Sequence, residues 1–525
     1  MFVKIALLLC FFAVMIFVGV LTRRSARDVN GFVLGGRSVG PWLTAFAYGT
    51  SYFSAVVFVG YAGQFGWKYG LSTTWVGIGN AIIGSLLAWI FLGRRTRVMT
   101  HHLDVRTMPE FFGRRYDSKA LRLVSSLIVF VFLIPYTASV YSGLSKLFGM
   151  AFNIDYKWCV IAMAALTALY VILGGYMATV MNDFIQGIIM LFGICAVVIA
   201  VLNGRGGFLS AIRQLSQVPC DPSSTNPALM GMSGPFVSFF GPDPANLLGV
   251  ILLTSLGTWG LPQMVQKFYA IKSEKAVKTG TVVSTIFAVI ISGGCYFLGG
   301  FGRLFDNPSI HAPDGKILYD GIIPSMLSNL PDALIGVVVV LVLSASMSTL
   351  SSLVLTSSST FTIDFLKISV FKKMSDKVQL FLMRILIVFF IAISVALAIN
   401  PPTFIAQLMG ISWGALAGAF LAPFLYGLFM KRVTKAAVWA SFIYGVGITL
   451  VNMILPKFGL GPLFKSSINC GAVAMLGSLV LVPLVSLITP KPDKDAVDEI
   501  FECYNEEVSV PKKMYLKEDD SEEKD

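Results

Sequence analysis

The 525-residue sequence has few charged residues: Asp, Glu, Lys and Arg make up 13% of the chain, whereas apolar residues make up 56%. Soluble domains carry about 25% charged residues. A water-soluble core of this composition is implausible, so we take the lipid bilayer as the solvent. The net charge of +12 does not by itself indicate nucleic-acid binding, because Lys and Arg concentrate in the cytoplasmic loops of membrane proteins.

Residues that mark metal and catalytic sites are also scarce. The seven cysteines show no CxxC or other metal-like spacing, so neither a disulfide framework nor a zinc site is indicated. The three histidines, His101, His102 and His311, fall in polar stretches. There is no intramembrane cluster of His, Asp and Glu, no HExxH and no nucleophile elbow. We therefore rank a membrane-embedded enzyme last and expect no catalytic residues and no organic cofactor.

The sequence contains many long apolar segments. A scan for stretches that can cross a bilayer as helices finds about 13. They cover approximately residues 4–22, 41–64, 73–93, 121–148, 156–174, 180–202, 245–270, 276–300, 333–360, 379–399, 402–430, 436–455 and 468–488. The first is expected to be retained, because its arginines follow the apolar run and no small-x-small cleavage site is present. The sequence therefore predicts an all-α polytopic membrane protein.

The loops between these segments differ in charge from one side to the other. Lys and Arg crowd the loop after the first segment and every second loop that follows, while the alternate loops carry far fewer. Because cytoplasmic loops are enriched in Lys and Arg, we expect the N-terminus outside and the C-terminus inside the plasma membrane. The tail at 489–525 mixes Lys, Glu and Asp and is predicted to be solvated and partly disordered.

The segment 341–360 carries no charge and many Ser and Thr residues. Ser344, Ser348, Ser351 and Ser352 recur at helical spacing on or near one stripe, with Thr349 beside it. Inside a membrane protein such a stripe either joins helices or lines the path of a small cation. Both interpretations stay open on composition alone.

Two predicted spans contain helix-breaking residues at bilayer depth. The first, 41–64, has Gly49 among hydroxyl residues, and the second, 245–270, has Gly257, Gly260 and Pro262. Unwound backbone is tolerated there only where protein or a water-filled cavity satisfies it. Ordinary Gly/Pro kinks are the alternative.

Interrupted helices at matching positions of two halves are typical of transporters built from inverted repeats. Helices 2–6 would then match helices 7–11. The expected divisions are a first helix and cytoplasmic loop at 1–40, repeat 1 at 41–202, an extracellular loop at 203–244, repeat 2 at 245–430, two further helices at 431–488 and the cytoplasmic tail at 489–525.

Carbonyls freed at the first break and hydroxyls of the segment 341–360 would together form an all-oxygen site, which suits a hard cation. The middle of neither span contains Asp or Glu. A proton-driven carrier would be expected to place a carboxylate or histidine there. The sequence thus favours Na⁺ over H⁺ as the coupling ion, with H⁺ as the alternative.

Four segments carry a resemblance to a known family: LGGRSVGPW at 34–42, GGYMATVMNDFIQG at 174–187, GLPQMVQKFYAIKSEKAVKTG at 260–280 and SASMSTLSS at 344–352. Together they resemble the sodium/solute symporter family, which includes the sodium/proline and sodium/pantothenate symporters. The resemblance extends from about residue 35 to 487. It implies a LeuT-type fold with a 5+5 inverted-repeat core and extra flanking helices.

The resemblance implies a sodium site at the first broken span. The backbone carbonyls that the family supplies from this break fall on Thr50 and Phe53. The carbonyl and the two adjacent hydroxyls that it supplies from the hydroxyl-rich segment fall on Ala345, Ser348 and Thr349.

At other family positions this chain either keeps the family's residue type or departs from it. Asp183 matches a position linked to the cytoplasmic sodium pathway, with a helix N-cap at the membrane surface as the alternative. Tyr136 matches an aromatic that helps to close the substrate site of the proline symporter. Tyr52 stands where that symporter has an acidic residue, and Thr254 and Thr258 stand where it has aromatics. Proline is therefore not assumed as the substrate.

Half-helix N-termini at the breaks would present free N–H groups to an anion. We therefore expect a small organic solute that carries a carboxylate, similar to pantothenate, an amino acid or an organic acid. The expected substrate contacts are Ser51, Tyr52, Tyr136, Thr254, Thr258, Trp259 and Gln263.

The expected function is a Na⁺-coupled symporter that imports this solute by alternating access. A transport-like sensor or receptor is the alternative, although the tail shows no signalling module. A channel is less favoured, because neither a ring-forming acidic sequence nor a TVGYG-like filter is present. The expected partners are the solute, Na⁺ and the bilayer, with no nucleic acid and no indicated protein partner.

Overall fold

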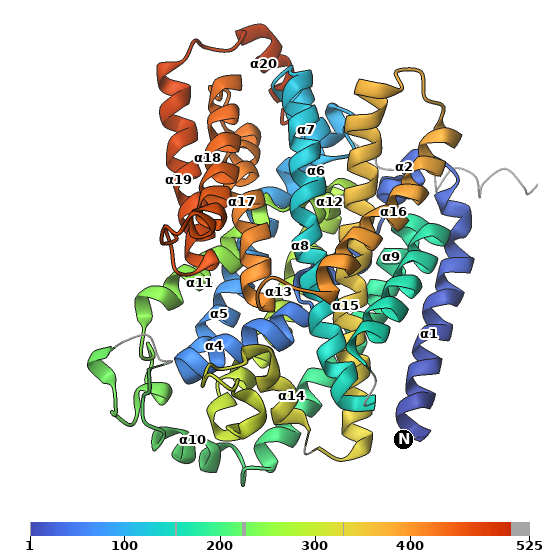
Figure 1. Cartoon of the computed structure of the whole chain (residues 1–525). Coiled ribbons are helices and arrows are strands. Elements are labelled where there is room, and N and C mark those ends of the chain that lie inside the picture. The colour runs from blue at the N-terminus through green and yellow to red at the C-terminus, as the bar shows by residue number, and fades with distance from the viewer. Residues whose placement is uncertain (1, 153–154, 223–226, 329, 506–525) are drawn as a thin grey trace, which may run out of the picture.

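The computed structural model describes residues 2–152, 155–222, 227–328 and 330–505. Within them the chain is helical, with isolated bridge pairs and no β-strand (Figure 1). The α-helices are α1 (Phe2–Thr22), α2 (Val29–Leu34), α3 (Pro41–Tyr52), α4 (Ala62–Tyr69), α5 (Thr74–Gly79), α6 (Arg94–His102), α7 (Met108–Arg115), α8 (Lys119–Phe152), α9 (Tyr156–Asn203), α10 (Phe208–Ser216), α11 (Pro244–Leu256), α12 (Pro262–Ala270), α13 (Glu274–Gly299), α14 (Ile322–Leu327), α15 (Asp332–Thr360), α16 (Asp376–Ile399), α17 (Ile405–Phe429), α18 (Lys435–Ile454), α19 (Ser467–Ile488) and α20 (Lys494–Glu502).

The described residues contain 10 helical stretches long and apolar enough to cross a membrane, or 11 when α11 and α12 are counted as one span bent by 47°. This confirms the prediction of an all-α polytopic protein. The stretches Val56–His102 and Tyr156–Asn203 hold 47 and 48 residues. At 1.5 Å per residue each would be about 70 Å long if straight, more than twice the roughly 30 Å of hydrocarbon in a bilayer.

A glycine breaks each of these two stretches. Gly70 has φ 62° and ψ −141°, and Gly175 has φ 56° and ψ −145°. Glycine adopts positive φ readily, because it has no Cβ. At Gly175 a Cβ would also lie 2.8 Å from the ring of Phe32 and 2.9 Å from its carbonyl oxygen. The non-helical backbone at these two positions therefore depends on glycine.

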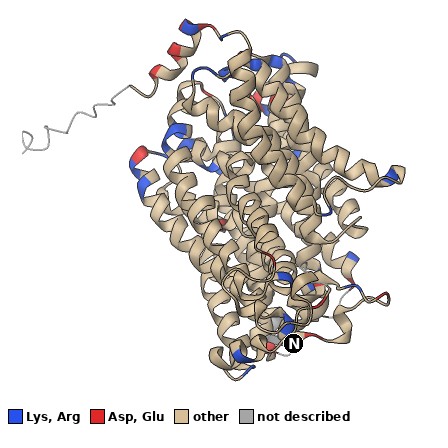
Figure 2. Cartoon of the chain, turned by 90° about the vertical axis from the view of Figure 1, so that its left-hand side faces the viewer, with Lys and Arg blue, Asp and Glu red and all other residues tan. Residues whose placement is uncertain are grey.

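The helices form one bundle, with the N-terminus at one end and α20 at the other (Figure 1). Helix α1 lies along one edge of the view beside α9, and α18 and α19 lie toward the opposite edge. The shorter helices α10 and α14 lie at the same end of the bundle as the N-terminus. Charged residues lie mostly toward the two ends and leave the middle of the bundle largely free of them (Figure 2).

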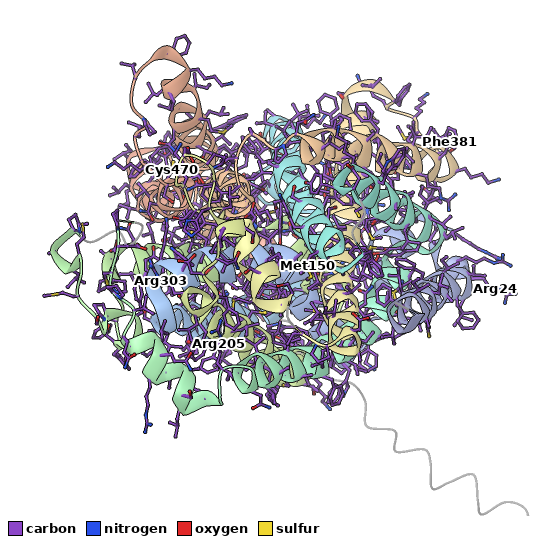
Figure 3. All side chains as sticks on the ribbon, turned by 60° about the horizontal axis from the view of Figure 1, so that its bottom comes forward. Arg24, Met150, Arg205, Arg303, Phe381 and Cys470 are labelled. Atoms are coloured by element: carbon purple, nitrogen blue, oxygen red, sulfur yellow. The ribbon has the colours of Figure 1, made fainter. Side chains whose placement is uncertain are left out.

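Labelled side chains lie both at the outer edge of the bundle and further inward (Figure 3). Arg24 and Phe381 lie at the outer edge, where Phe381 is 62% exposed. Arg303 lies inward, where its guanidinium donates to the carbonyl oxygen of Trp67 at 2.7 Å and pairs with Asp221 at 2.8 Å. Exposed aromatic residues on the flanks suit a lipid-facing surface.

Every residue of the segment 341–360 in α15 is buried. Most of its hydroxyls donate to carbonyls one turn earlier in the same helix, as Ser346 does to Val342 at 2.7 Å. Other hydroxyls of the segment contact neighbouring helices: among them, Ser352 contacts Ser51 of α3, and Thr356 donates to Gln266 of α12 at 2.8 Å. Part of the hydroxyl stripe thus does join helices.

Candidate functional site

Both predicted helix breaks are present. Helix α3 ends at Tyr52, and Phe53 adopts φ −107° and ψ 96°, after which a π-helical segment, Val56–Tyr61, continues the span. Helix α11 passes into the 3₁₀ turn Gly257–Gly260, and α12 starts again at Pro262. Proline fits the first position of a helix, where no N–H is needed. The two breaks leave backbone groups free in the interior of the bundle.

Hydroxyls of α15 point at the first break. Ser348 Oγ lies 3.0 Å from the carbonyl oxygen of Thr50 and 3.1 Å from that of Ala345. Thr349 Oγ1 lies 3.3 Å from the Thr50 oxygen and 3.1 Å from the Ala345 oxygen. Oxygens that bind a hard cation at about 2.3–2.6 Å stand about 3.2–3.7 Å apart when they meet at right angles. These four oxygens already have spacings close to that range.

The fifth predicted ligand, Phe53, borders the same region. It lines a small void of about 10 Å³ together with Ala345 and Ser54. The void is near the smallest volume that holds one water molecule. The five residues predicted to bind Na⁺ therefore lie around the break in α3.

Aromatic side chains surround the backbone just beyond these oxygens. Tyr52 donates from its hydroxyl to the carbonyl oxygen of Thr254 at 2.5 Å and stacks on Phe53, with ring centroids 4.3 Å apart. Tyr52 and Tyr136 lie on either side of Trp413, at centroid distances of 6.3 and 5.9 Å. The Tyr136 hydroxyl and the Trp413 indole N–H are buried and have no hydrogen-bond partner among the described residues.

Buried donors without partners are unfavourable unless a ligand or water satisfies them. The cluster of Tyr52, Tyr136 and Trp413 is therefore a candidate set of contacts for a polar solute. Trp413 was missed in the sequence, where its segment shows only as another apolar span. An aromatic among small residues, ISWGALAG at 411–418, is the one signal that could have drawn attention to it.

The remaining predicted contacts fall into two groups. The hydroxyls of Thr254 and Thr258 donate within their own helical turns, to Val250 and Ser255, both at 2.8 Å. Both polar atoms of the Gln263 side chain are buried without a partner in the described chain, so Gln263 can contact a solute.

Trp259 lies apart from the aromatic cluster. Its indole N–H donates to the carbonyl oxygen of Ile83 at 3.0 Å, and its ring packs 5.9 Å from that of Phe91, which is 45% exposed. These contacts direct Trp259 toward the flank of the bundle.

Asp183 lies within α9, so the N-cap alternative is wrong. It is fully buried, and its Oδ2 lies 3.7 Å from Nζ of Lys267, whose side chain is 2% exposed. Lys267 also donates to Ser352 Oγ at 2.9 Å, and that oxygen lies 2.9 Å from Ser51 Oγ. The sequence did not reveal this polar chain, because 84 residues separate Asp183 from Lys267.

Known proteins resemble this chain over most of its length. The profile of the sodium:solute symporter family matches residues 32–445. The osmoregulated proline transporter OpuE of Bacillus subtilis is 28% identical over 496 residues, which cover 92% of this chain and 94% of that protein. The sodium/proline symporter of Staphylococcus aureus is 30% identical over 500 residues, 92% of each chain. That of Escherichia coli K12 is 27% identical over 450 residues, 85% of this chain and 86% of that protein.

Solved structures show the same fold. A substrate-bound, outward-open Na⁺-coupled sialic acid symporter superposes with a TM-score of 0.72 at 18% identity, over 94% of this chain and 99% of that chain. Mhp1, a nucleobase-cation-symport-1 family transporter in a closed conformation, superposes with a TM-score of 0.51 at 13% identity, over 90% of this chain and 98% of that chain.

These likenesses place the fold in the LeuT type that the sequence predicted. The extent of the profile match confirms the family resemblance, and with it Na⁺ as the coupling ion and a multi-pass location in the plasma membrane. The chain belongs to the sodium:solute symporter family.

Proposed function

We propose that this protein imports a small carboxylate-bearing solute together with Na⁺ by alternating access between the two faces of the membrane. The observation that carries the proposal is the meeting of Ser348 and Thr349 with the Thr50 carbonyl at the broken helix α3. The bond network joins two elements distant in sequence, so an ion bound there would hold them together. Its release would let them separate, as alternating access requires.

The proposed sodium ligands are the carbonyl oxygens of Thr50, Phe53 and Ala345 and the hydroxyls of Ser348 and Thr349. These five ligands are all neutral oxygens, which suit a hard monovalent cation without a carboxylate among them. Asp183 faces Lys267 of α12. We assign Asp183 to the cytoplasmic part of the sodium pathway.

The proposed solute site is the cluster of Tyr52, Tyr136 and Trp413 with Gln263 and Ser51. Helix α12 starts at the break beside Gln263, where the positive end of its dipole favours a carboxylate. Thr254 and Thr258 complete one wall through their backbone. Proline is one candidate, because the relatives include sodium/proline symporters, and a pantothenate-like or organic-acid solute is another.

The proposed topology has 13 spans, with the N-terminus outside and the C-terminus inside. Val56–His102 and Tyr156–Asn203 are each too long for a single crossing and break at Gly70 and Gly175. With α3 and Val56–Tyr69 counted as one span, this division gives the 13 segments expected from the sequence. The repeats 41–202 and 245–430 then each hold five spans, flanked by 1–40, 203–244, 431–488 and 489–525.

The test is uptake of labelled solutes into proteoliposomes. Pantothenate, proline and a panel of small carboxylates would be offered with an inward Na⁺ gradient and then with choline in place of Na⁺. We expect one solute class to accumulate only with Na⁺. Equal uptake in both salts, driven by a pH gradient, would overturn the assignment of Ser348 and Thr349 and favour H⁺ coupling.

A further inference from the structure

A buried charge pair lies next to the proposed sodium site. The side chains of Lys267 and Asp183, on α12 and α9, are 2% and 0% exposed. Burying two charges in such an environment is costly, and intramembrane ionisable groups usually serve transport. The proposed function assigns Asp183 to the ion pathway but leaves the lysine unexplained.

The ammonium of Lys267 has three partners. Asp183 Oδ2 lies 3.7 Å away, Ser352 Oγ accepts a hydrogen bond at 2.9 Å, and the Tyr176 ring centroid lies 5.3 Å away. A carboxylate, a hydroxyl and a ring face all stabilise a cation. These three contacts hold the lysine nitrogen at a fixed position.

This position is close to the proposed sodium ligands. Ser352 follows Ser348 by one helical turn of α15, a rise of about 6 Å. Ser352 also contacts Ser51, the residue after the ligand Thr50. A sodium ion at Ser348 and the Lys267 ammonium are then like charges separated by about one turn of helix.

Asp183 also lies near the proposed ligands, on the helix that packs against them. Four residues beyond it along α9, a Cβ on Gly187 would lie 3.1 Å from Cγ2 of Thr50, so α9 packs directly against the site. Because neither carboxyl oxygen has a hydrogen-bond partner among the described residues, the charge of Lys267 is the main compensation for this carboxylate.

We propose that Lys267 is a positioning residue, a fixed internal cation whose charge weakens Na⁺ binding and so favours release toward the cytoplasm, with Asp183 as its counter-charge. This inference rests on the proposed sodium site. Removing the lysine charge strengthens Na⁺ binding, since its repulsion is lost and the attraction of Asp183 for the ion is no longer opposed. Removing the aspartate charge weakens Na⁺ binding. For two charges about 6 Å apart, an effective dielectric constant of about 40, between the values for protein and for water, makes each effect on the order of tenfold.

The test measures ²²Na⁺ binding to purified protein, for which no solute is needed. The expected results are a Kd about tenfold lower in Lys267→Gln, a Kd about tenfold higher in Asp183→Asn, and a Kd within threefold of the parent in Lys267→Arg. A purely structural pair would weaken binding in both neutral variants. Unchanged or weaker binding in Lys267→Gln therefore overturns the proposal.

An exposed ion pair provides the matched control. Lys316 and Asp314 lie 2.7 Å apart at the N-terminal end of the bundle, away from the site. Lys316→Gln and Asp314→Asn should leave the Na⁺ Kd unchanged. A shift in these controls equal to the shift in Lys267→Gln would mean that net charge alone acts and would overturn the proposal.

Removing only one partner leaves the other charge buried and unpaired, which can prevent folding. A double variant avoids this. In Lys267→Met with Asp183→Asn no charge is left unpaired, and the two effects should cancel to a Kd within threefold of the parent. A tenfold weaker Kd in this variant would show that the pair builds the site, contrary to the proposal. Ser348→Ala tests the proposed sodium site separately from the role of Lys267. If this variant leaves Na⁺ binding unchanged, the proposed sodium site itself is wrong.

Discussion

Ser348 in α15 donates a hydrogen bond to the Thr50 carbonyl at 3.0 Å, two residues before the end of α3. The bond spans 298 residues of sequence and lies where both helices are completely buried. A hydroxyl at this position can rotate its proton away and present its oxygen to a cation. The same contact joins the two helices and, in the proposed sodium site, would supply ligands to the ion.

Loss of either hydroxyl should weaken Na⁺ activation. We expect Ser348→Ala and Thr349→Ala to raise the Na⁺ concentration for half-maximal uptake by about 10- to 100-fold, because a contact to a charged partner contributes about 1.5–3 kcal/mol. The measurement is solute uptake as a function of Na⁺ concentration. Ser346→Ala is the matched control, since Ser346 donates only to Val342 of its own helix. An equal effect in the control would contradict the sodium site.

Tyr136 should matter for the solute more than for stability. Its hydroxyl has no partner among the described residues, so Tyr136→Phe removes a buried unsatisfied group and should not lower the Tm. The KM for the solute should rise several-fold. Tyr170→Phe is the contrast: its hydroxyl donates to Met347 at 2.7 Å, and its removal should lower the Tm. Thermal-shift and uptake measurements on both variants distinguish the roles, and an unchanged KM in Tyr136→Phe would count against the solute pocket.

Asp320 predicts a pH dependence of stability outside the spans. Burial raises the pKa of its carboxyl to about 6, against an opposing hydrogen bond from the Ile405 N–H and the charge of Lys146. Because the folded-state pKa exceeds the ordinary value, the neutral form is favoured on folding, and this stabilisation is lost as pH rises from about 4 to 6. The upper limit is about 3 kcal/mol.

Asp320→Asn should therefore raise the Tm at pH 7.5 by about 2 °C and change it little at pH 4.5. The comparison is a thermal-shift series across this range. A Tm difference that is constant with pH would show that Asp320 does not titrate in the window.

Gly175 should not tolerate a side chain. Its φ of 56° and the nearby Phe32 both oppose a Cβ, and strain of this kind costs about 1–3 kcal/mol. Gly175→Ala should lower the Tm and the yield of folded protein. Gly293→Ala is the control, because a Cβ there meets nothing within 4 Å. If the Gly175→Ala protein were as stable as the control, glycine would not be required at the kink in α9.

Local chemistry explains which features could be predicted from the sequence. Gly49, Gly260 and Pro262 interrupt apolar runs, and such interruptions point to broken helices wherever they lie. Hydroxyls clustered without charge in 341–360 likewise point to a buried polar role. The family motifs then related Thr50 to Ser348, which periodicity alone could not do.

Features that depend on helix rotation and packing were not predictable. Lys267 follows the second break in a polar stretch, and nothing local shows that it turns inward to meet Asp183. Trp259 and Trp413 are both aromatics in apolar spans, yet one faces the flank and the other the site. A helical pattern states which residues share a face, but neighbouring helices decide which face is central.

The most direct test of Na⁺ coupling is solute-stimulated ²²Na⁺ influx into proteoliposomes. For the solute that the protein accumulates, we predict that adding the unlabelled compound outside increases ²²Na⁺ entry, and that Ser348→Ala abolishes the increase at low Na⁺. Transport of the solute with no change in ²²Na⁺ influx would contradict the account.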